Sequence, residues 1–387
     1  MKVIYTSPNS SHHYRYARML HEAGVLHKFV SGFSRLSPRA ALDELGDELV
    51  RKDFLQTAYL ISLRSKIPVA VSRQIAYLAK IEQDNACKRY LDGADIFMYY
   101  NGSGLNTSKA ARKKGKIVIV EAVNSHVQYQ EDLMKEEYES LGLPWVPFHA
   151  KEKERRLAEY QLADYILLPS NFVKRSFIQA GFPEKMLLRV PYGFTQLTSA
   201  TTENVEKEQK EFVVLYVGSI SVRKGLRYLI KAFEQLNHPN KKLMIVGPES
   251  NPNGLNDIVI PEGVVFTGIL KGEQLNAAYK GASVFCLPSI EEGLALVLGE
   301  ALSFGVPIIA TENTGADDII TNGEEGFIVP IRDSNSILEK LQLLADDRDA
   351  YNTMKEKAVK KASSLKGWDE TGRLLVASLN DVFTARV

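Results

Sequence analysis

Two carboxylates, Glu292 and Glu300, flank the start of a predicted helix and could act on one ligand. An apolar run at residues 284–287 predicts a buried strand, and a periodic apolar pattern over residues 294–304 predicts the helix. The two side chains would lie about 12 Å apart along the helix axis and within about 80° of each other. They could therefore meet the two ends of an elongated polar ligand. The alternative is that one is a solvated acid and the other an ordinary surface glutamate, because such a pair would show the same spacing.

The loop between that strand and that helix is suited to binding oxygen atoms. A further apolar run at residues 308–311 predicts a second buried strand, which makes a strand–helix–strand unit with Gly293 at the start of the helix. The free N–H groups of such a helix start point above the strand ends, where they favour an anion or hydroxyl oxygens.

Two adjacent cations, Arg223 and Lys224, follow another predicted strand at residues 212–217 and precede Gly225. A diphosphate fits this loop, because an arginine can bind two oxygens at once and a lysine adds a mobile charge. The loop is not a P-loop, since GxxxxGK[ST] is absent. Two solvated loop cations remain the alternative.

The composition indicates a soluble globular protein with more than one core. The chain has 387 residues, of which 45% are hydrophobic and 25% charged. Its two cysteines show no metal-binding spacing, and Asp347 and Asp349 fit a helix end better than a metal site, so no metal is expected. No apolar run reaches about 18 residues and no signal peptide is apparent, so we expect a cytoplasmic protein.

The net charge of +1 conceals a basic first half. Residues 1–195 carry 28 Lys and Arg against 21 Asp and Glu, whereas the rest carries 20 against 26. Residues 35–92 combine basic and apolar side chains, which predicts peripheral contact with the inner face of a membrane. A helix pair with a solvated basic face has the same pattern. No feature points to nucleic acid.

Each half of the chain opens with a buried strand, at residues 2–6 and 212–217, and continues as alternating helices and strands. This order predicts two similar doubly wound α/β domains, with a cleft between them. The polar residues 197–211 predict the linker. The first strand–helix loop lacks GxGxxG, so a dinucleotide-binding oxidoreductase is disfavoured.

The stretch over residues 284–330 resembles retaining glycosyltransferases of family 4, which have the two-domain GT-B fold. The resemblance is carried by P-S-x-x-E-G-L-x-L-x-x-x-E-A-L-x-x-G-x-P-I-I-A-T, continued by G-A-D-D-I-I-x-x-G-x-x-G-F-I-V. It implies that Glu292 faces the donor sugar and that Glu300 holds the ribose. It also implies that backbone amides touch sugar hydroxyls or phosphate at Gly293, Leu294 and Ala295.

The cation loop resembles the family's G-R-L-x-x-x-K-G, with Gly218, Lys224 and Gly225 in register. The resemblance implies that these residues bind the donor and that Lys224 takes part in catalysis. Ser219 replaces the family's usual arginine, and Arg223 would supply the missing charge.

Three further positions acquire roles by the same resemblance. Ile269 lies where the backbone would hold the nucleotide base, and His126 follows a predicted strand where a catalytic histidine would face the donor sugar. The first loop carries His12 and His13 in place of the family's glycine pair. Both could contact the acceptor, although adjacent residues on a helix are expected to face different ways.

The resemblance implies a first, acceptor-binding domain at residues 1–197 and a second, nucleotide-sugar-binding domain at 198–367. A last helix, residues 368–387, would cross back to the first domain. The implied activity is the retaining, metal-independent transfer of a sugar from a UDP- or GDP-sugar to a glycan, a lipid-linked or a small-molecule acceptor. A nucleotide-sugar epimerase and a non-catalytic nucleotide-sugar-binding protein remain alternatives.

Overall fold

The computed structural model describes residues 1–65, 67–195, 211–250 and 252–386, which form two fully parallel β-sheets. The first sheet has the order β3-β2-β1-β4-β5-β6-β7, and the second has the order β10-β9-β8-β11-β12-β13. In each sheet the strand order reverses beside the first strand of its domain, which is the doubly wound pattern. The prediction of two Rossmann-like α/β domains is confirmed.

The central strands are buried runs of β-branched and aromatic residues, as expected for parallel strands that helices cover on both faces. The strands of the first sheet are β1 Val3–Ser7, β2 Leu26–Ser31, β3 Leu49–Arg51, β4 Ile96–Tyr100, β5 Ile117–Glu121, β6 Tyr165–Leu168 and β7 Leu187–Arg189. Those of the second are β8 Phe212–Val217, β9 Lys241–Val246, β10 Val264–Gly268, β11 Val284–Leu287, β12 Ile308–Thr311 and β13 Gly326–Val329. The predicted linker at residues 197–211 lies outside the described residues except for Glu211.

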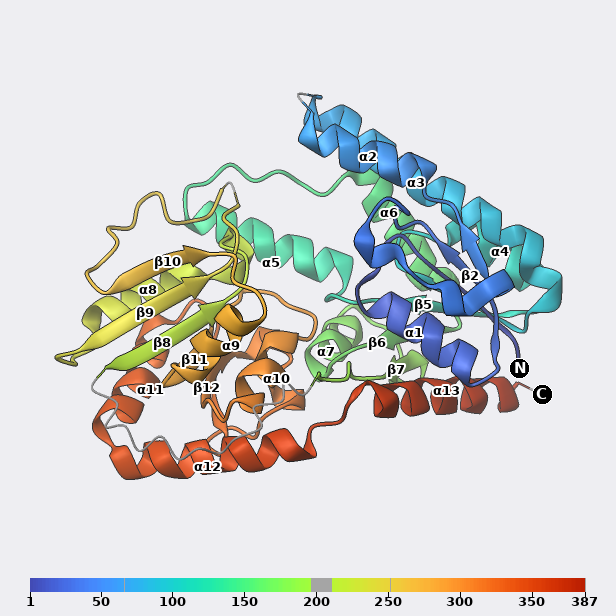
Figure 1. The fold of residues 1–387 in the computed structure, drawn as a ribbon. Helices are drawn as coiled ribbons and strands as arrows, with labels where there is room; N and C mark the ends of the chain where they lie inside the picture. Colours follow the sequence, from blue (N-terminus) through green and yellow to red (C-terminus); the bar gives the residue numbers. More distant parts are fainter. Residues whose placement is uncertain (66, 196–210, 251, 387) are drawn as a thin grey trace.

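Helices cover both faces of each sheet, and the two domains lie side by side (Figure 1). The first domain contains α1 Ser11–Glu22, α2 Phe54–Arg64, α3 Val69–Cys87, α4 Leu105–Lys113, α5 Val127–Ser140, α6 Ala150–Leu162 and α7 Asn171–Gln179. The later helices are α8 Leu226–Gln235, α9 Glu273–Lys280, α10 Leu296–Ser303, α11 Ser334–Asp346, α12 Arg348–Ser364 and α13 Trp368–Thr384. The Asp347 carboxylate caps α12 by accepting from the Ala350 N–H at 2.9 Å, which fits the predicted helix end.

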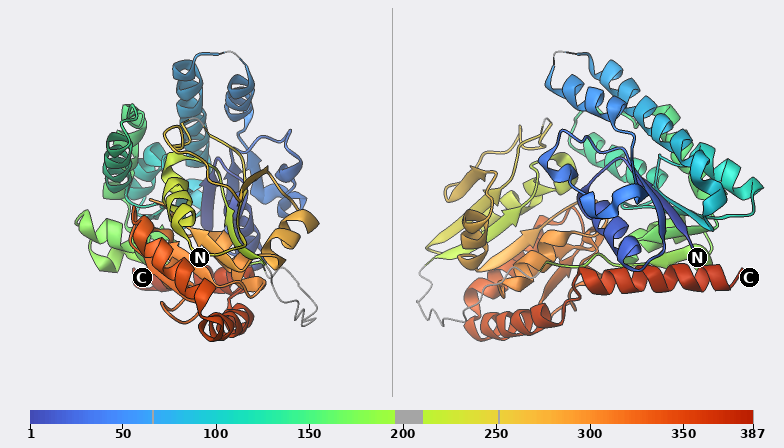
Figure 2. Two further views of the ribbon diagram at one scale, coloured as in Figure 1. Left: turned by 90° about the vertical axis from the view of Figure 1, so that its left-hand side faces the viewer. Right: turned by 45° about the vertical axis from the view of Figure 1, so that its right-hand side comes forward.

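The last helix, α13, runs along the first domain beside α1, whereas α12 lies under the second domain (Figures 1 and 2). Gly372 allows the close packing, because a Cβ there would lie 2.8 Å from Met19 Cγ. At the crossing, the Trp368 ring stacks on Tyr192 at 6.1 Å between centroids, and Arg15 lies over the same indole. The chain end therefore ties the two domains together.

Helices α2 and α3 form a hairpin that projects from the first domain (Figure 1). Apolar side chains are exposed on it, among them Phe54, Ile61 and Leu63. The basic and apolar pattern predicted over residues 35–92 includes Lys66, which lies outside the described residues. In the part of the chain that the structure describes, no helix is long and apolar enough to cross a membrane.

Candidate functional site

Lys224 and Arg223 converge on the carboxylate of Glu292, although the two cations and the acid are far apart in sequence. Lys224 Nζ pairs with Glu292 Oε2, and Arg223 Nη1 lies 3.1 Å from the same oxygen. Burial works to raise the pKa of Glu292, but the two cations outweigh it and lower that pKa. Burial lowers the pKa of Lys224, against the attraction of Glu292. The structure thus brings together two cations and one carboxylate that the sequence placed in separate loops.

Local backbone geometry holds the two loops against each other. Lys224 ends a short 3₁₀ turn, and Gly225 follows it with a φ of 61°, in the left-handed region that glycine favours. A Cβ at Gly225 would lie 2.1 Å from the Pro288 carbonyl oxygen, so only glycine permits this contact. The Ile290 N–H donates to the Arg223 carbonyl at 2.9 Å. The cation loop and the acid loop therefore form one unit above β8 and β11.

The neighbouring acid, Glu291, is a functional candidate that sequence reasoning missed. Its side chain is 0% exposed, and its carboxylate accepts hydrogen bonds from Ser125 and Gln130 of the first domain. A Glu-Glu pair in a loop is usually solvated, so nothing in the local sequence predicts that its first member is buried. The only feature of the sequence that could have indicated a role for Glu291 is its position between an apolar turn and the Glu292 motif.

The loop after Glu292 is pressed against the first domain. A Cβ at Gly293 would lie 1.8 Å from the Val123 carbonyl oxygen, which requires glycine there. Leu294 and Ala295 are buried, and the Ala295 N–H donates to the Thr314 carbonyl at 3.1 Å. That amide is therefore not free for a ligand in this structure, contrary to its expected role. Helix α10 also starts later than predicted, because Ala295 has extended backbone angles.

Glu300 lies on α10 and does not join the cation cluster. Its Oε2 accepts from the Tyr279 hydroxyl at 2.9 Å, and the side chain is half-buried. Ile269 follows β10 and is 60% exposed. Gly218 follows β8, where a Cβ would lie 2.9 Å from the Tyr216 hydroxyl. These three residues are positioned around the C-terminal ends of the second sheet.

His126 precedes α5, but its ring lies in an aromatic cluster of the first domain. Phe177 and Tyr160 lie at 5.2 Å between ring centroids, and Phe182 lies at 5.8 Å. Burial lowers the pKa of His126 to about 4, so the imidazole is neutral near pH 7. Its Nδ1 is buried without a hydrogen-bond partner among the described residues. The structure does not bring this ring to the Lys224 cluster, and its catalytic role stays a prediction.

His12 and His13 both bind Glu121, at the end of β5. His12 Nε2 lies 2.6 Å from Glu121 Oε1, His13 Nδ1 lies 3.1 Å from Oε2, and the Tyr5 hydroxyl donates to Oε2 at 2.7 Å. The expectation that the two histidines face different ways is wrong, because their ring centroids are only 3.9 Å apart. Their contact with the acceptor stays a prediction, and one ring nitrogen of each histidine already has a partner.

The His12, His13 and Glu121 side chains are also the one group that could hold a metal ion among the described residues. Burial lowers the pKa of His12 to about 4, and the histidines lower the pKa of Glu121 against the effect of its burial. A neutral imidazole at His12 and an ionised carboxylate at Glu121 would suit a metal. The hydrogen bonds that join these side chains and Tyr5 also form without a metal ion.

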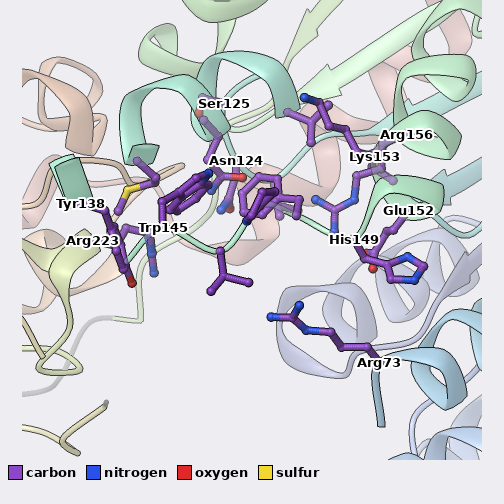
Figure 3. A pocket seen from close by; sticks show the side chains of 18 of the residues that line it. Arg73, Asn124, Ser125, Tyr138, Trp145, His149, Glu152, Lys153, Arg156 and Arg223 are labelled. Carbon is purple, nitrogen blue, oxygen red and sulfur yellow. Dashed lines mark hydrogen bonds and ion pairs between the residues drawn. The ribbon is translucent and has the colours of Figure 1, made fainter. Parts of the chain in front are cut away.

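A pocket of about 970 Å³ lies beside α5 and α6 in the first domain and reaches Arg223 of the second domain (Figure 3). One part is apolar and aromatic, with Tyr138 and Trp145 near Arg223. The opposite part is polar, with Arg73, His149, Glu152, Lys153 and Arg156. Because Arg223 also contacts Glu292, this pocket adjoins the cation cluster directly.

The polar end of the pocket carries excess positive charge. Glu152 pairs with both Lys80 and Arg156, and these cations lower its pKa to about 2 although burial opposes them. Lys153 is paired with Glu131. Arg156 Nε is buried and has no hydrogen-bond partner in the part of the chain that the structure describes, and Arg73 is exposed. An anionic group would fit between these side chains.

Comparison with known proteins links the second domain to one family. Residues 199–361 match the family model described as glycosyl transferases group 1. The chain is 31% identical over 204 residues to a sulfoquinovosyl transferase of Arabidopsis thaliana, covering 49% of this chain and 39% of that protein. It is 29% identical over 256 residues to a D-inositol 3-phosphate glycosyltransferase of Corynebacterium glutamicum, covering 60% and 61%. The chain thus spans less than two thirds of either relative.

The fold of the whole chain is also found among solved structures. Sucrose-phosphate synthase from Thermosynechococcus elongatus matches over 100% of both chains, with a TM-score of 0.70 and 18% identity. At this identity the likeness concerns the fold alone, which is the two-domain GT-B architecture. The match to the family model includes the loops that hold Lys224 and Glu292. Residues 199–361 of this chain are therefore similar to the group 1 glycosyltransferases.

Proposed function

We propose that this protein is a retaining glycosyltransferase that moves a hexosyl group from a UDP- or GDP-sugar to an acceptor hydroxyl. The observation that carries the proposal is the cluster of Lys224, Arg223 and Glu292, which lies within the family-matched domain and adjoins a pocket of the other domain. A donor held at the cluster would present its sugar towards that pocket.

In the proposed reaction, the bond between the anomeric carbon and the β-phosphate oxygen breaks, and its electron pair stays on the phosphate. The acceptor oxygen bonds to the anomeric carbon on the same face, and its proton passes to the departing phosphate. Lys224 and Arg223 stabilise the growing phosphate charge, and Glu292 favours the positive charge that develops on the sugar. The two cations give the diphosphate its counter-charge, which supports transfer without a metal ion.

On the donor side, Glu300 and Ile269 have the remaining roles. The Glu300 carboxylate binds the ribose hydroxyls, in place of or beside its present hydrogen bond to Tyr279. The backbone of Ile269, a residue that is largely exposed, holds the base. Readout by backbone atoms leaves little trace in a sequence, so UDP and GDP are both candidates.

On the acceptor side, the pocket supports an acceptor that has an anionic group as well as the reactive hydroxyl. Its aromatic part adjoins Arg223, where the hydroxyl would meet the donor sugar. Its cationic end, with Arg73 and the unpartnered Arg156 Nε, would hold a phosphate or carboxylate. The name of the inositol phosphate glycosyltransferase relative includes a phosphate, which agrees with this choice. A lipid-linked acceptor would reach the pocket past the exposed apolar residues of the α2–α3 hairpin.

The proposal is tested by a thermal-shift screen with UDP, GDP and their sugars, since a ligand that binds only the folded state raises the melting temperature. The best donor is then incubated with phosphorylated and unphosphorylated acceptors, and nucleotide release is measured. Nucleotide release that requires the acceptor supports transfer, and retention of the anomeric configuration in the product supports the stereochemistry. Conversion of the donor sugar to its epimer without an acceptor, or binding with no product, would contradict the proposal.

A further inference from the structure

Glu291 forms a bridge between the two domains. Its Oε1 accepts from the Ser125 backbone N–H at 3.1 Å and from the Ser125 hydroxyl at 2.8 Å. Its Oε2 accepts from Gln130 Nε2 at 2.8 Å. Both partners belong to the first domain, just before α5 and in its first turn, whereas Glu291 belongs to the second.

The same residue binds a cation of the proposed donor site. Arg223 Nη1 donates to the Glu291 carbonyl oxygen at 2.7 Å and lies 3.6 Å from its carboxylate. That guanidinium also pairs with Glu292. Glu291 therefore contacts the first domain on one side and the diphosphate-binding cation on the other.

Burial makes this arrangement sensitive to the distance between the domains. The Glu291 side chain is fully buried, so its charge depends on these hydrogen bonds and on Arg223. If the domains separated, the Glu291 carboxylate would lose its hydrogen bonds to Ser125 and Gln130. Among the described residues, Arg223 would then be its one remaining charged neighbour. The tight contact between Gly293 and the Val123 carbonyl would open at the same time.

We infer that Glu291 is a positioning residue, which couples closure of the first domain to the placement of Arg223. The inference rests on the proposed function, because Arg223 is assigned to the donor diphosphate. Ser125, Gln130 and Arg223 all line the pocket proposed for the acceptor. The buried Glu291 carboxylate thus holds Ser125 and Gln130 of the pocket wall in a fixed position relative to Arg223. The donor sugar and the acceptor hydroxyl meet only when these contacts are formed.

The test variant is Glu291→Gln, which keeps the side-chain size and removes the charge. We expect kcat to fall about 100-fold, the cost of misplacing reacting groups by about 1 Å, while the Kd for the nucleoside diphosphate changes less than threefold. Small-angle X-ray scattering of the ligand-free protein should show a larger radius of gyration than the wild type. An unchanged kcat and radius would overturn the inference, as would a loss of nucleotide binding equal to the loss in kcat.

A second variant separates the bridge from a general loss of stability. In the double variant Glu291→Gln with Gln130→Glu, the amide and the carboxylate exchange domains, so the hydrogen bond between the two side chains can form again. Recovery of at least tenfold in kcat and of the compact radius supports the bridge. Failure to recover either one shows that the charge is needed at residue 291 itself and overturns the bridging role.

Glu137 provides a matched control, because it is also a fully buried carboxylate that bridges the domains. It accepts from Tyr228 and Arg332 of the second domain but does not contact Arg223. Glu137→Gln leaves the hydrogen bonds of Glu291 to Ser125 and Gln130 in place, so kcat should not fall 100-fold, and equal losses in both variants would overturn the specific role of Glu291. If the wild type transfers no sugar, the proposed function fails, whereas the scattering comparison still decides whether Glu291 holds the domains together.

Discussion

The Lys224 ammonium is paired with the Glu292 carboxylate, so the cation that a diphosphate would bind is already neutralised by an acid of its own domain. Arg223 shares the same carboxylate oxygen. A donor must therefore displace Glu292 from both cations before its phosphates can replace it. This exchange would turn the carboxylate towards the sugar at the moment the diphosphate binds.

Removing the Glu292 charge should strengthen nucleotide binding and abolish transfer. In Glu292→Gln, Lys224 and Arg223 no longer have to leave a carboxylate, so we expect the Kd for UDP or GDP to fall about tenfold, which is about 1.4 kcal/mol. Transfer should fall because the developing positive charge on the sugar loses its partner. Calorimetric titration and initial rates measure the two effects, and weaker nucleotide binding by this variant would contradict the exchange.

The same ion pair predicts how stability depends on pH. Its cations lower the pKa of Glu292 in the folded protein. The stabilisation is therefore present above the unfolded value of about 4.3 and is lost as pH falls through the lower folded pKa. The difference in melting temperature between the wild type and Glu292→Gln should shrink as pH falls below about 4. A difference that grows towards acid pH would show that the pair is not stabilising.

The cationic end of the pocket should select anionic acceptors. Arg73 is exposed at this end, so Arg73→Ala should fold normally and raise KM for a phosphorylated acceptor about tenfold, or about 1.4 kcal/mol. The Kd for nucleotide and the rate with an uncharged acceptor should not change. Lys109→Ala, which removes an exposed cation from α4, is the control and should leave KM unaltered. An equal effect of both variants would indicate general electrostatic attraction.

Removing metal ions should leave transfer intact. In the proposed mechanism, Lys224 and Arg223 would supply the charge that a divalent cation otherwise provides at the diphosphate. The rate after exhaustive chelation should equal the rate with added Mn²⁺ or Mg²⁺. Because His12, His13 and Glu121 could hold a metal, the melting temperature should be recorded as well. A rate that vanishes on chelation and returns with Mn²⁺ would contradict the cation-based mechanism.

Local sequence patterns predicted most of the fold, because strands and turns depend mainly on residues that are close together in the sequence. The strands at residues 284–287 and 308–311 were predicted with their exact bounds, since each is a buried apolar run closed by a turn. The cation loop and the Glu292 loop were both selected correctly as neighbours of strand ends. Their direct contact through one carboxylate required the tertiary structure, because no local pattern encodes it.

The missed features depend on contacts between distant segments. Glu291 is buried only because the first domain supplies Ser125 and Gln130, and nothing near Glu291 in the sequence indicates this. His12 and His13 were expected to diverge, but Glu121 lies close enough for both rings to reach it. Ring orientation and burial of this kind follow from packing, which periodicity alone cannot give.

Nucleotide titration of Lys224→Ala decides whether this cluster binds the donor, and the thermal melt of the same variant checks its folding. We expect the wild type to bind UDP or GDP and the variant to bind it at least tenfold more weakly. We also expect transfer to fall on the order of 10² to 10³-fold, the usual cost of losing one charged contact to the transition state. Equal affinity and near wild-type transfer in a folded Lys224→Ala variant would contradict the assignment of this cluster to the donor.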